Sequence, residues 1–292
     1  MGKRILLFLV TNLAIMVVLS IVLSLLGFGG YLGPDGQLLI GPLMVFCLIW
    51  GMGGALISLL ISRMVAKWAM GIKLVNGQTG NEQLDWLHST VGNLARQANL
   101  PMPEVGIYDS PEVNAFATGP SKKRSLVAVS TGLLQTMSRQ EASAVLGHEL
   151  GHIANGDMVT MTLIQGVVNA FVMFFARIIA FAVRQVVHEK IAWILSFVVR
   201  IVMEIVLGIL GSMVTAWFSR KREFRADAAG AALAGRENMV AALERLRSSV
   251  DLVDTRHPSL ATAKISGRKS WLQAFSTHPP LELRIEALRA GR

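Results

Sequence analysis

Residues 138–156 read SRQEASAVLGHELGHIANG, a stretch that combines signals for both ends of a helix with two closely spaced histidines. Ser138, followed three residues later by Glu141, is the pattern of a capping box, in which each side chain bonds the backbone of the other residue. The box predicts a helix over residues 139–154, and the Asn-Gly pair that follows is a typical stop signal. The HELGH segment therefore lies on a helix with defined ends.

On that helix His148 and His152 lie one turn apart and face the same way, so both imidazoles can hold one tetrahedral zinc ion. Glu149 lies beside them. There it can take a proton from a zinc-bound water that attacks a peptide carbonyl, and later pass the proton to the leaving amine. An ordinary polar helix face is the alternative. The specific HExxH pattern on a capped helix favours a zinc peptidase with one Zn²⁺ per chain.

A third metal ligand must come from elsewhere. Metzincins continue the motif with a Gly and then a His, but these positions hold Asn155 and Met158, which excludes that class. Residues 219–227, SRKREFRAD, offer Glu223 with Asp227 one helical turn later. A second helix could place Glu223 on the metal and Asp227 on the far ring nitrogen of a ligating histidine. A solvated charged face is an equally good interpretation of these residues alone.

The composition indicates a membrane protein. Of 292 residues, 52% are hydrophobic and only 16% are charged, which is too apolar for an ordinary soluble protein of this size. The net charge of +9 suits either nucleic acid or an anionic membrane surface. Because the basic residues flank apolar runs and do not alternate with aromatics, no nucleic acid partner is expected. Cys47 is the only cysteine, which excludes an internal disulfide and a cysteine-based metal site.

Two apolar runs near the N-terminus, residues 5–26 and 38–62, are each long enough to cross a bilayer. A cleaved signal peptide is the alternative for the first run, but the run is too long for one and shows no cleavage site. The turn between the runs, GFGGYLGPDGQ, has no Lys or Arg. The positive-inside rule therefore places the outer ends of this hairpin in the cytoplasm. These ends carry Lys3, Arg4, Arg63, Lys67 and Lys73.

Two later apolar runs cover residues 158–176 and 191–218, the second interrupted by Arg200 and Glu204, whose spacing allows them to pair on one helix face. These runs either span the bilayer or form a hairpin that is buried partly against protein or lies at the membrane interface. The candidate ligands lie before the first of these runs and after the second. An even number of crossings thus separates them, and both polar parts lie on the cytoplasmic side.

The first polar part contains one amphipathic helix over residues 81–98. Three short β-prone segments separated by turn residues follow it, over residues 104–108, 113–118 and 125–130. The sequence therefore predicts a small α+β domain that carries the HELGH helix.

Four motifs, HELGHIANGD, SRKREFRADAAG, NAFATG and STHPPLELRI, together with the two-span start, resemble the HtpX-type heat-shock membrane proteases, relatives of the CaaX prenyl proteases. The likeness extends over nearly the whole chain. It implies that His148, His152 and Glu223 bind zinc and that Glu149 is the catalytic base. It also implies a protease of the bacterial inner membrane that degrades damaged or misassembled membrane proteins, in overlap with the ATP-dependent membrane protease FtsH. This chain has no nucleotide-binding motif and is not expected to use ATP.

The resemblance assigns roles to two weaker sites. The segment Asn114, Ala115, Phe116, Ala117 and Thr118 is similar to the strand on which an extended substrate pairs by its backbone, although the sequence alone indicates only a strand. His278 and Arg284 would stabilise the oxyanion or orient the site. The alternative is local structure around Pro279 and Pro280, with Arg284 paired to an acid such as Asp227.

The predicted fold is a mainly α membrane protein with four transmembrane helices and a cytoplasmic α+β, gluzincin-like zinc protease domain. Its predicted parts are a transmembrane hairpin (1–64), the first half of the protease domain (65–157), a second hydrophobic hairpin (158–218) and the second half of the protease domain (219–292). Both termini and the active site are expected in the cytoplasm. His152 lies six residues before the apolar run at Met158, or roughly 9 Å along a helix, which favours polypeptide substrates in or at the lipid bilayer.

Two other functions remain open. A site-specific processing protease of the prenyl-peptide type would enclose its site in a larger helical cage, for which four spans are few. A zinc-binding membrane protein without proteolysis, such as a sensor or transporter, would place His and Asp inside its spans, whereas here the histidines lie outside them.

Overall fold

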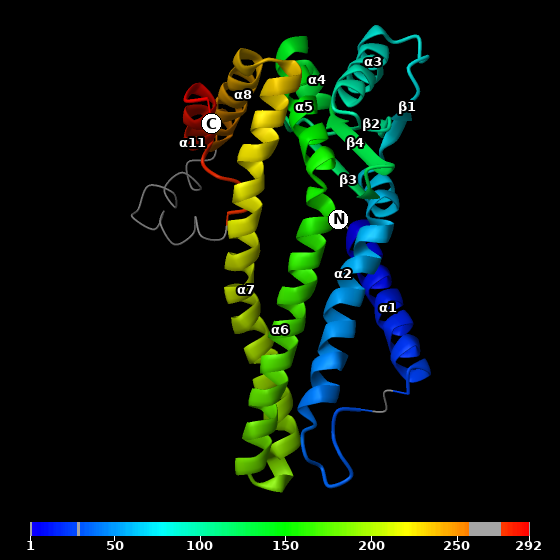
Figure 1. Cartoon of the computed structure of the whole chain (residues 1–292), viewed down its shortest axis with the longest axis vertical. Coiled ribbons are helices and arrows are strands. Elements are labelled where there is room, and N and C mark those ends of the chain that lie inside the picture. The colour runs from blue at the N-terminus through cyan, green and yellow to red at the C-terminus, as the bar shows by residue number, and fades with distance from the viewer. Residues whose placement is uncertain (1, 28–29, 257–275, 292) are drawn as a thin grey trace. The chain divides into compact units, whose positions relative to one another are not determined.

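The structure is a computed structural model that describes residues 2–27, 30–256 and 276–291 (Figure 1). Its contacts divide the chain into two compact units, each built from separated segments. One unit contains residues 1–58 and 160–215, and the other contains residues 59–159 and 216–292. Contacts alone assign no function to these units, so the division of the chain into functional domains stays a prediction.

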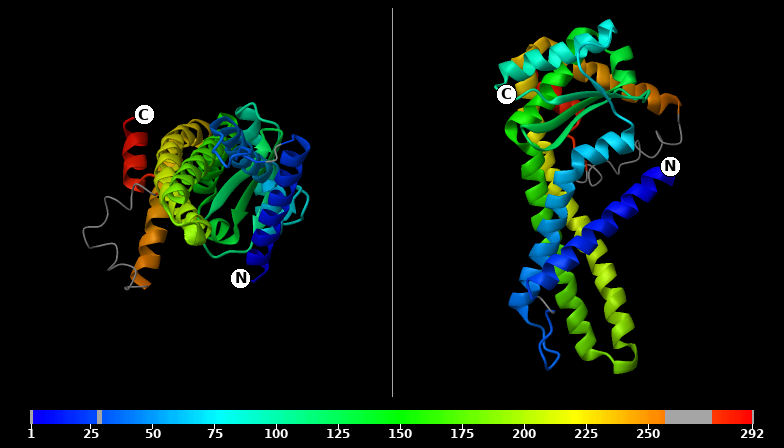
Figure 2. Two further views of the ribbon diagram at one scale, coloured as in Figure 1. Left: turned by 90° about the horizontal axis from the view of Figure 1, so that it is seen from below. Right: turned by 90° about the vertical axis from the view of Figure 1, so that its right-hand side faces the viewer.

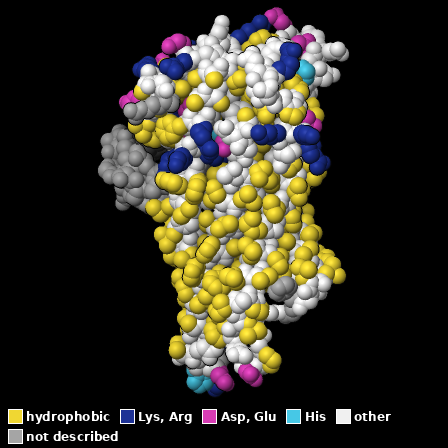
Figure 3. Space-filling view, viewed as in Figure 1, with side chains coloured by type: hydrophobic (Ala, Val, Ile, Leu, Met, Phe, Trp, Pro, Cys, Tyr) yellow, Lys and Arg dark blue, Asp and Glu magenta, His cyan; other side chains and the backbone are white. Residues whose placement is uncertain are grey.

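The first unit consists of long apolar helices. They are α1 (Gly2–Leu25), the greater part of α2 (Ile40–Met70), most of α6 (Asp157–Val186) and the N-terminal part of α7 (Glu189–Ala234). Hydrophobic side chains cover much of the surface of this unit on the face shown in Figure 3. Within the described residues, three helices, α2, α6 and α7, are long and apolar enough to cross a membrane, whereas the apolar segment found in α1 is shorter, Leu13–Leu25. The fourth predicted span therefore stays a prediction.

Small residues allow close packing inside this unit. A Cβ added at Gly51 of α2 would lie only 2.6 Å from the backbone nitrogen of Ala170 on α6. Between α6 and α7, Glu204 is paired with Arg177, with Nη1 and Oε1 3.3 Å apart. The spacing of Arg200 and Glu204 had suggested a pair within one helix. The pair that forms instead joins two helices, because the nearer guanidinium comes from the neighbouring helix.

The second unit contains a four-stranded sheet in the order β1-β2-β4-β3. Figure 2 shows strands of this sheet as arrows. Its strands are β1 (Lys73–Val75), β2 (Glu104–Tyr108), β3 (Ala115–Ser121) and β4 (Arg124–Ser130). β2 and β4 are parallel, and the outer pairs β1–β2 and β3–β4 are antiparallel. The three predicted strands are thus present, and β1 is an addition that the sequence did not predict.

The same unit contains the helices α3 (Glu82–Gln97), α4 (Thr131–Thr136), α5 (Arg139–Asn155), α8 (Arg236–Arg256) and α11 (Leu281–Arg289). Of these, α3, α4 and α5 contact the sheet, and α8 packs against α5 and α11. α5 contacts β3 and β4 as well as α3 and α8, so it lies at the centre of the unit. Its inner residues, including Leu146, Leu150 and Ile153, are completely buried. Burial of each such side chain contributes about 2 kcal/mol to folding.

Both predicted ends of α5 are confirmed. The Glu141 amide donates to the Ser138 hydroxyl oxygen at 3.2 Å, and the Ser138 amide donates to the Glu141 carboxylate at 2.8 Å, which completes the capping box. At the other end Gly156 has a φ of 69°, a left-handed conformation that Gly adopts without strain. The helix that carries the histidines is therefore fixed at both ends by local interactions.

The glycines of the HELGH helix bring α5 close to the C-terminal part of α7. A Cβ at Gly147 would lie 3.2 Å from the Cα of Gly230, and a Cβ at Gly151 would lie 2.8 Å from the Cβ of Ala229. Larger side chains at these positions would hold the helices apart. The small residues thus allow a side chain of α7 to reach the histidines of α5.

Candidate metal centre

Three side chains from α5 and α7 converge on one point. The Nε2 atoms of His148 and His152 lie 3.1 Å apart. A Glu223 carboxylate oxygen lies 3.7 Å from Nε2 of His148, and the other lies 3.4 Å from Nε2 of His152. One candidate ligand atom from each residue lies within 4.8 Å of the others, the spacing of donors around a single ion. The structure therefore brings together the three residues that the sequence nominated as zinc ligands.

The far nitrogen of each ring is held by a buried carboxylate. Nδ1 of His148 lies 2.9 Å from Asp227, and Nδ1 of His152 lies 2.8 Å from Asp157. Both aspartates are only 1% exposed. A carboxylate on Nδ1 holds a proton there, so Nε2 is the ring nitrogen that is turned toward a metal. Both rings are thus oriented for a cation between their Nε2 atoms.

Arg284 of α11 is anchored to Asp227. Its Nε and Nη2 atoms donate to the two carboxylate oxygens of Asp227 at 2.7 and 2.6 Å. A third nitrogen, Nη1, lies 3.4 Å from Glu223. The sequence had left open whether Arg284 contacts the site or pairs with an acid such as Asp227, and the structure places it in both relationships.

His278 lies just before α11 and contacts the same carboxylate. Its Nδ1 atom lies 2.7 Å from Oε2 of Glu223, while 65% of its side chain is exposed. One edge of the ring therefore orients Glu223, and the other edge faces solvent. This arrangement is compatible with both roles that the resemblance suggests.

The chemistry of the donor set fits a metal ion. Oε1 of Glu223 is buried and has no hydrogen-bond partner within the described residues. A buried carboxylate oxygen without a partner costs free energy unless a cation or a donor faces it. Burial would raise the pKa of Glu223, but His152 and His278 hold it well below its usual range, so the carboxylate is charged. Two imidazole nitrogens and one carboxylate oxygen are a typical ligand set of catalytic zinc.

The pKa of His152 also reflects this arrangement. Burial lowers it, but the bonded carboxylate of Asp157 and the nearby carboxylate of Glu223 outweigh burial and raise the pKa to about 9. A ligating imidazole must be neutral at the atom that binds the metal. A metal ion that bound His152 would therefore displace a proton.

Glu149 lies beside the ligands, and its side chain is buried. Burial raises the pKa of its carboxyl, and the nearby histidines act in the opposite direction, as does a hydrogen bond from the backbone amide of Ala117. A raised pKa suits a group that both accepts and returns a proton near neutral pH. The Ala117 contact also joins strand β3 to the site.

A cavity of about 190 Å³ opens at this centre. His148, Glu149 and Glu223 line its polar side together with His278 and Arg284. Its apolar side is formed by Leu133, Val145, Met239, Leu243 and Leu246, with Val113, Asn114 and Ala115 near β3. The cavity thus combines candidate catalytic groups with space for an apolar side chain.

Comparison with known families identifies the chain. Residues 81–292 match the family described as Peptidase family M48. The chain belongs to this family. The M48 peptidase is 51% identical over 294 residues to Protease HtpX of Aeromonas hydrophila subsp. hydrophila. This alignment covers 98% of this chain and 99% of that protein. The peptidase is 52% identical over 297 residues to a Protease HtpX homolog of Bacillus licheniformis. This alignment covers 99% of this chain and 100% of that protein.

A solved structure described as Crystal Structure of S. mikatae Ste24p has the same fold, with a TM-score of 0.65 at 17% identity. The structural match covers 99% of this chain and 67% of the Ste24p chain. The predicted HtpX-type resemblance is therefore confirmed, and the M48 peptidase is a membrane metalloprotease. Membership of a metalloprotease family implies a bound metal, and the His-His-Glu cluster is compatible with it.

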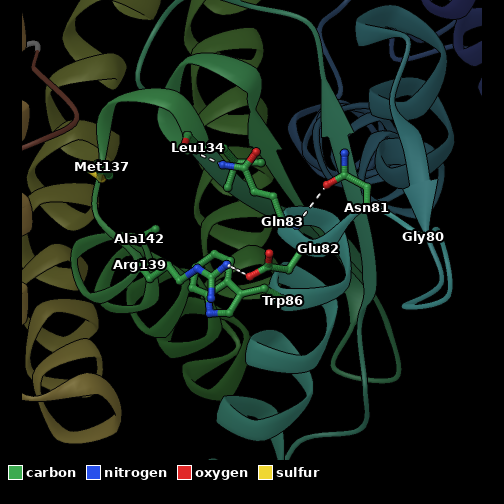
Figure 4. A pocket seen from close by; sticks show the side chains of 9 residues that line it. All are labelled: Gly80, Asn81, Glu82, Gln83, Trp86, Leu134, Met137, Arg139 and Ala142. Carbon is green, nitrogen blue, oxygen red and sulfur yellow. Dashed lines mark hydrogen bonds and ion pairs between the residues drawn. The ribbon is translucent and has the colours of Figure 1, made fainter.

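A second cavity of the M48 peptidase, of about 490 Å³, lies where α3 and α5 begin (Figure 4). Its charged side chains are already satisfied by each other, because Arg139 forms an ion pair with Glu82 and lies over the ring of Trp86. The Gln83 amide donates to the carbonyl of Leu134 at 2.8 Å. These contacts show that the polar side chains of this cavity stabilise the fold. Among the residues that line it, none has an unpaired carboxylate like that of the metal centre.

Sequence reasoning missed Asp157, the partner of His152. The residue was visible only as the last letter of the HELGHIANGD motif. Its role depends on the left-handed Gly156, after which α6 begins at Asp157 and the carboxylate lies against the histidine ring. An acid directly after the Gly that ends an HExxH helix is the signal that could have found it.

Proposed function

We propose that this chain is a zinc endopeptidase of the bacterial inner membrane, with one Zn²⁺ held by His148, His152 and Glu223. Its active site and both termini lie in the cytoplasm. It cleaves damaged or misfolded membrane proteins, and some cytoplasmic ones, in quality control and the stress response, in overlap with FtsH and without ATP. The convergence of the three ligand side chains beside Glu149 carries this proposal.

Each residue of the centre has a chemical task. A zinc ion bound there would polarise the scissile carbonyl and make water more acidic. Glu149 accepts a proton from the attacking water and returns it to the leaving amine, as its buried position and raised pKa allow. Asp227 and Asp157 hold the two rings in one tautomer and orientation. His278 lies where its exposed edge can donate to the negative charge that develops on the substrate oxygen.

Strand β3 supplies a place for the substrate backbone. It is the edge strand next to β4 and contacts α5, so its outer edge has no strand partner among the described residues. An extended peptide can add to such an edge by main-chain hydrogen bonds, which select no sequence. The segment Asn114–Thr118 therefore suits a protease that accepts many unfolded substrates.

The membrane part favours substrates at the bilayer. We expect four spans, the N-terminal hairpin and the α6–α7 hairpin, with the tip of each hairpin outside the cytoplasm. The two ligand helices continue into apolar spans, because α6 begins directly after the HELGH helix and Glu223 follows the apolar part of α7. A substrate exposed at the cytoplasmic surface of the membrane needs little extraction to reach such a site.

The purified chain in detergent, supplied with zinc and an unfolded protein such as casein, tests this function. We expect wild type and Glu237→Gln to cleave, because Glu237 is exposed at the start of α8. Glu149→Gln should bind one zinc per chain and lose cleavage by about a hundredfold or more. If Glu149→Gln cleaved casein as fast as wild type, Glu149 would not be the catalytic base. Zinc binding without any cleavage by wild type would favour a zinc-binding membrane protein, and cleavage of prenylated peptides alone would favour a processing protease.

A further inference from the structure

Three arginines line one cavity in the first unit, and no residue of the metal centre is part of its lining. The cavity has a volume of about 200 Å³. Arg177 and Arg184 come from the end of α6, and Arg200 comes from the beginning of α7. Residues Tyr31, Leu32 and Leu38, which lie between α1 and α2, complete the lining on another side. The connection between α1 and α2 thus lies beside the parts of α6 and α7 that flank their turn.

The positive charge in this cavity is not balanced. Glu204 pairs with Arg177 at 3.3 Å. Within the part of the chain that the structure describes, Arg184 and Arg200 have no carboxylate partner, and Nε of Arg177 is buried without a hydrogen-bond partner. Like charges repel strongly where the surroundings are apolar. An anion in the cavity would relieve this repulsion, and guanidinium groups bind phosphate with paired hydrogen bonds.

The surroundings of the arginines resemble a membrane interface. Arg200 lies over the ring of Phe197 at 5.2 Å, and exposed Trp193 lines the same cavity. Aromatic side chains of this kind gather at the level of lipid headgroups. The apolar run 158–176 of α6 is roughly 28 Å long at about 1.5 Å per residue, which matches the ~30 Å hydrocarbon core. If this run crosses the bilayer, as proposed above, Arg177 and the residues after it lie among the headgroups.

The arginines near the α6–α7 turn also depart from the usual distribution of positive charge in membrane proteins. Cationic residues concentrate on the cytoplasmic side, and the turn between α1 and α2 obeys this rule because it has no Lys or Arg. The α6–α7 hairpin has three arginines and Lys190 at the same end. A binding function for the arginines accounts for this exception.

We propose that Arg177, Arg184 and Arg200 form a binding site for the phosphate group of an anionic phospholipid in the leaflet at the α6–α7 turn. The guanidinium groups hold the phosphate, and the exposed apolar surfaces of α6 and α7 contact the acyl chains. A lipid in this place would join the end of α6 to the start of α7. The site is independent of the metal centre and of protein cleavage.

Native mass spectrometry of the full chain, titrated with phosphatidylglycerol or with phosphatidylcholine of the same acyl chains, tests the proposal. We expect wild type to bind phosphatidylglycerol at least tenfold more tightly. The variant Arg184→Gln/Arg200→Gln should lose this preference. The control Lys122→Gln/Lys123→Gln removes the same charge from exposed lysines outside the cavity and should keep it. Arg177 is left unchanged because its loss would leave Glu204 unpaired.

Equal binding of the two lipids, or a preference that survives the arginine replacements, would overturn the proposal. If millimolar inorganic phosphate displaced the lipid, and this displacement required the same arginines, the site would be one for free phosphate. That result would overturn the assignment to a lipid. Should the glutamine variant fail to fold, Arg184→Lys/Arg200→Lys replaces it. This variant keeps the charge but loses the paired hydrogen bonds, so binding should weaken several-fold. Unchanged affinity would contradict the role of the guanidinium groups.

Discussion

The carboxylate of Asp157 lies 2.8 Å from Nδ1 of His152, so the ring of one candidate ligand is oriented by a residue only five positions further along the chain. Asp157→Asn keeps the shape of this contact but removes its charge. We expect zinc affinity to fall by about 10- to 100-fold with little change in folding. Competition with a zinc-binding dye measures the affinity. Asp35→Asn, in the exposed turn between α1 and α2, is the control, and equal affinities of the two variants would contradict the assignment.

Glu223→Gln removes the charge of the third candidate ligand and should abolish stoichiometric zinc binding. Because a metal that binds only the folded state stabilises it, zinc should raise the unfolding temperature of wild type and not of this variant. Removal of zinc with a chelator should lower the wild-type value to that of the metal-free protein. A variant that still binds one zinc ion tightly would show that Glu223 is not a ligand.

Gly151→Ala tests the close approach of the two ligand helices. The added Cβ would lie 2.8 Å from the Cβ of Ala229, so α5 and α7 must move apart and the ligands no longer meet in the same geometry. We expect zinc affinity and casein cleavage to fall by about tenfold or more. Gly208→Ala is the matched control, because its added Cβ would meet no described side chain and no backbone beyond its own helix turn within 4 Å. A Gly151→Ala protein with full activity would show that the contact is not needed.

Arg284→Met leaves the buried carboxylate of Asp227 without its cation. Removing one partner of a buried pair costs about 3–5 kcal/mol, and the thermal unfolding temperature should fall clearly. Arg289→Met, which breaks an exposed pair with Glu244, should cost about 1 kcal/mol or less. Adding Asp227→Asn to Arg284→Met should recover part of the loss. Additive effects of the two changes would argue against their coupling.

The proposed crossing of α6 and α7 predicts the location of their turn. In a chain with Cys47→Ala, His188→Cys should react with an impermeant maleimide added outside the inner membrane. Lys122→Cys, in the turn between β3 and β4, should react only after the membrane is opened. Protection of both cysteines would favour a hairpin at the cytoplasmic interface.

The features that the sequence predicted are those with local causes. The ends of α5 follow from Ser138, Glu141 and Gly156, all adjacent to the helix that they delimit. The spacing of His148 and His152 fixes their common face before any folding is known. Strand β1 was missed because three residues, two of them exposed, carry no readable periodicity. Interactions between distant segments lack such signals.

Two pairs illustrate this limit. The spacing of Arg200 and Glu204 suggested a pair on one helix, but Glu204 bonds Arg177, which only the packing of α6 against α7 brings near. The contact of Arg284 with Asp227 joins residues far apart in the chain, and the sequence named it only as one of two alternatives. Residue types indicate which groups need partners, whereas tertiary packing selects the partners.

The candidate ligands lie on opposite sides of the α6–α7 hairpin in the chain, with the histidines on α5 and Glu223 near the end of α7. During synthesis, a nascent chain that has already exposed HELGH still lacks its carboxylate ligand. The ligand set is complete only after both helices of the hairpin have been made and α7 has packed against the two glycines of α5. With the proposed ligand set, we therefore expect the peptidase to stay inactive until translation has passed Glu223.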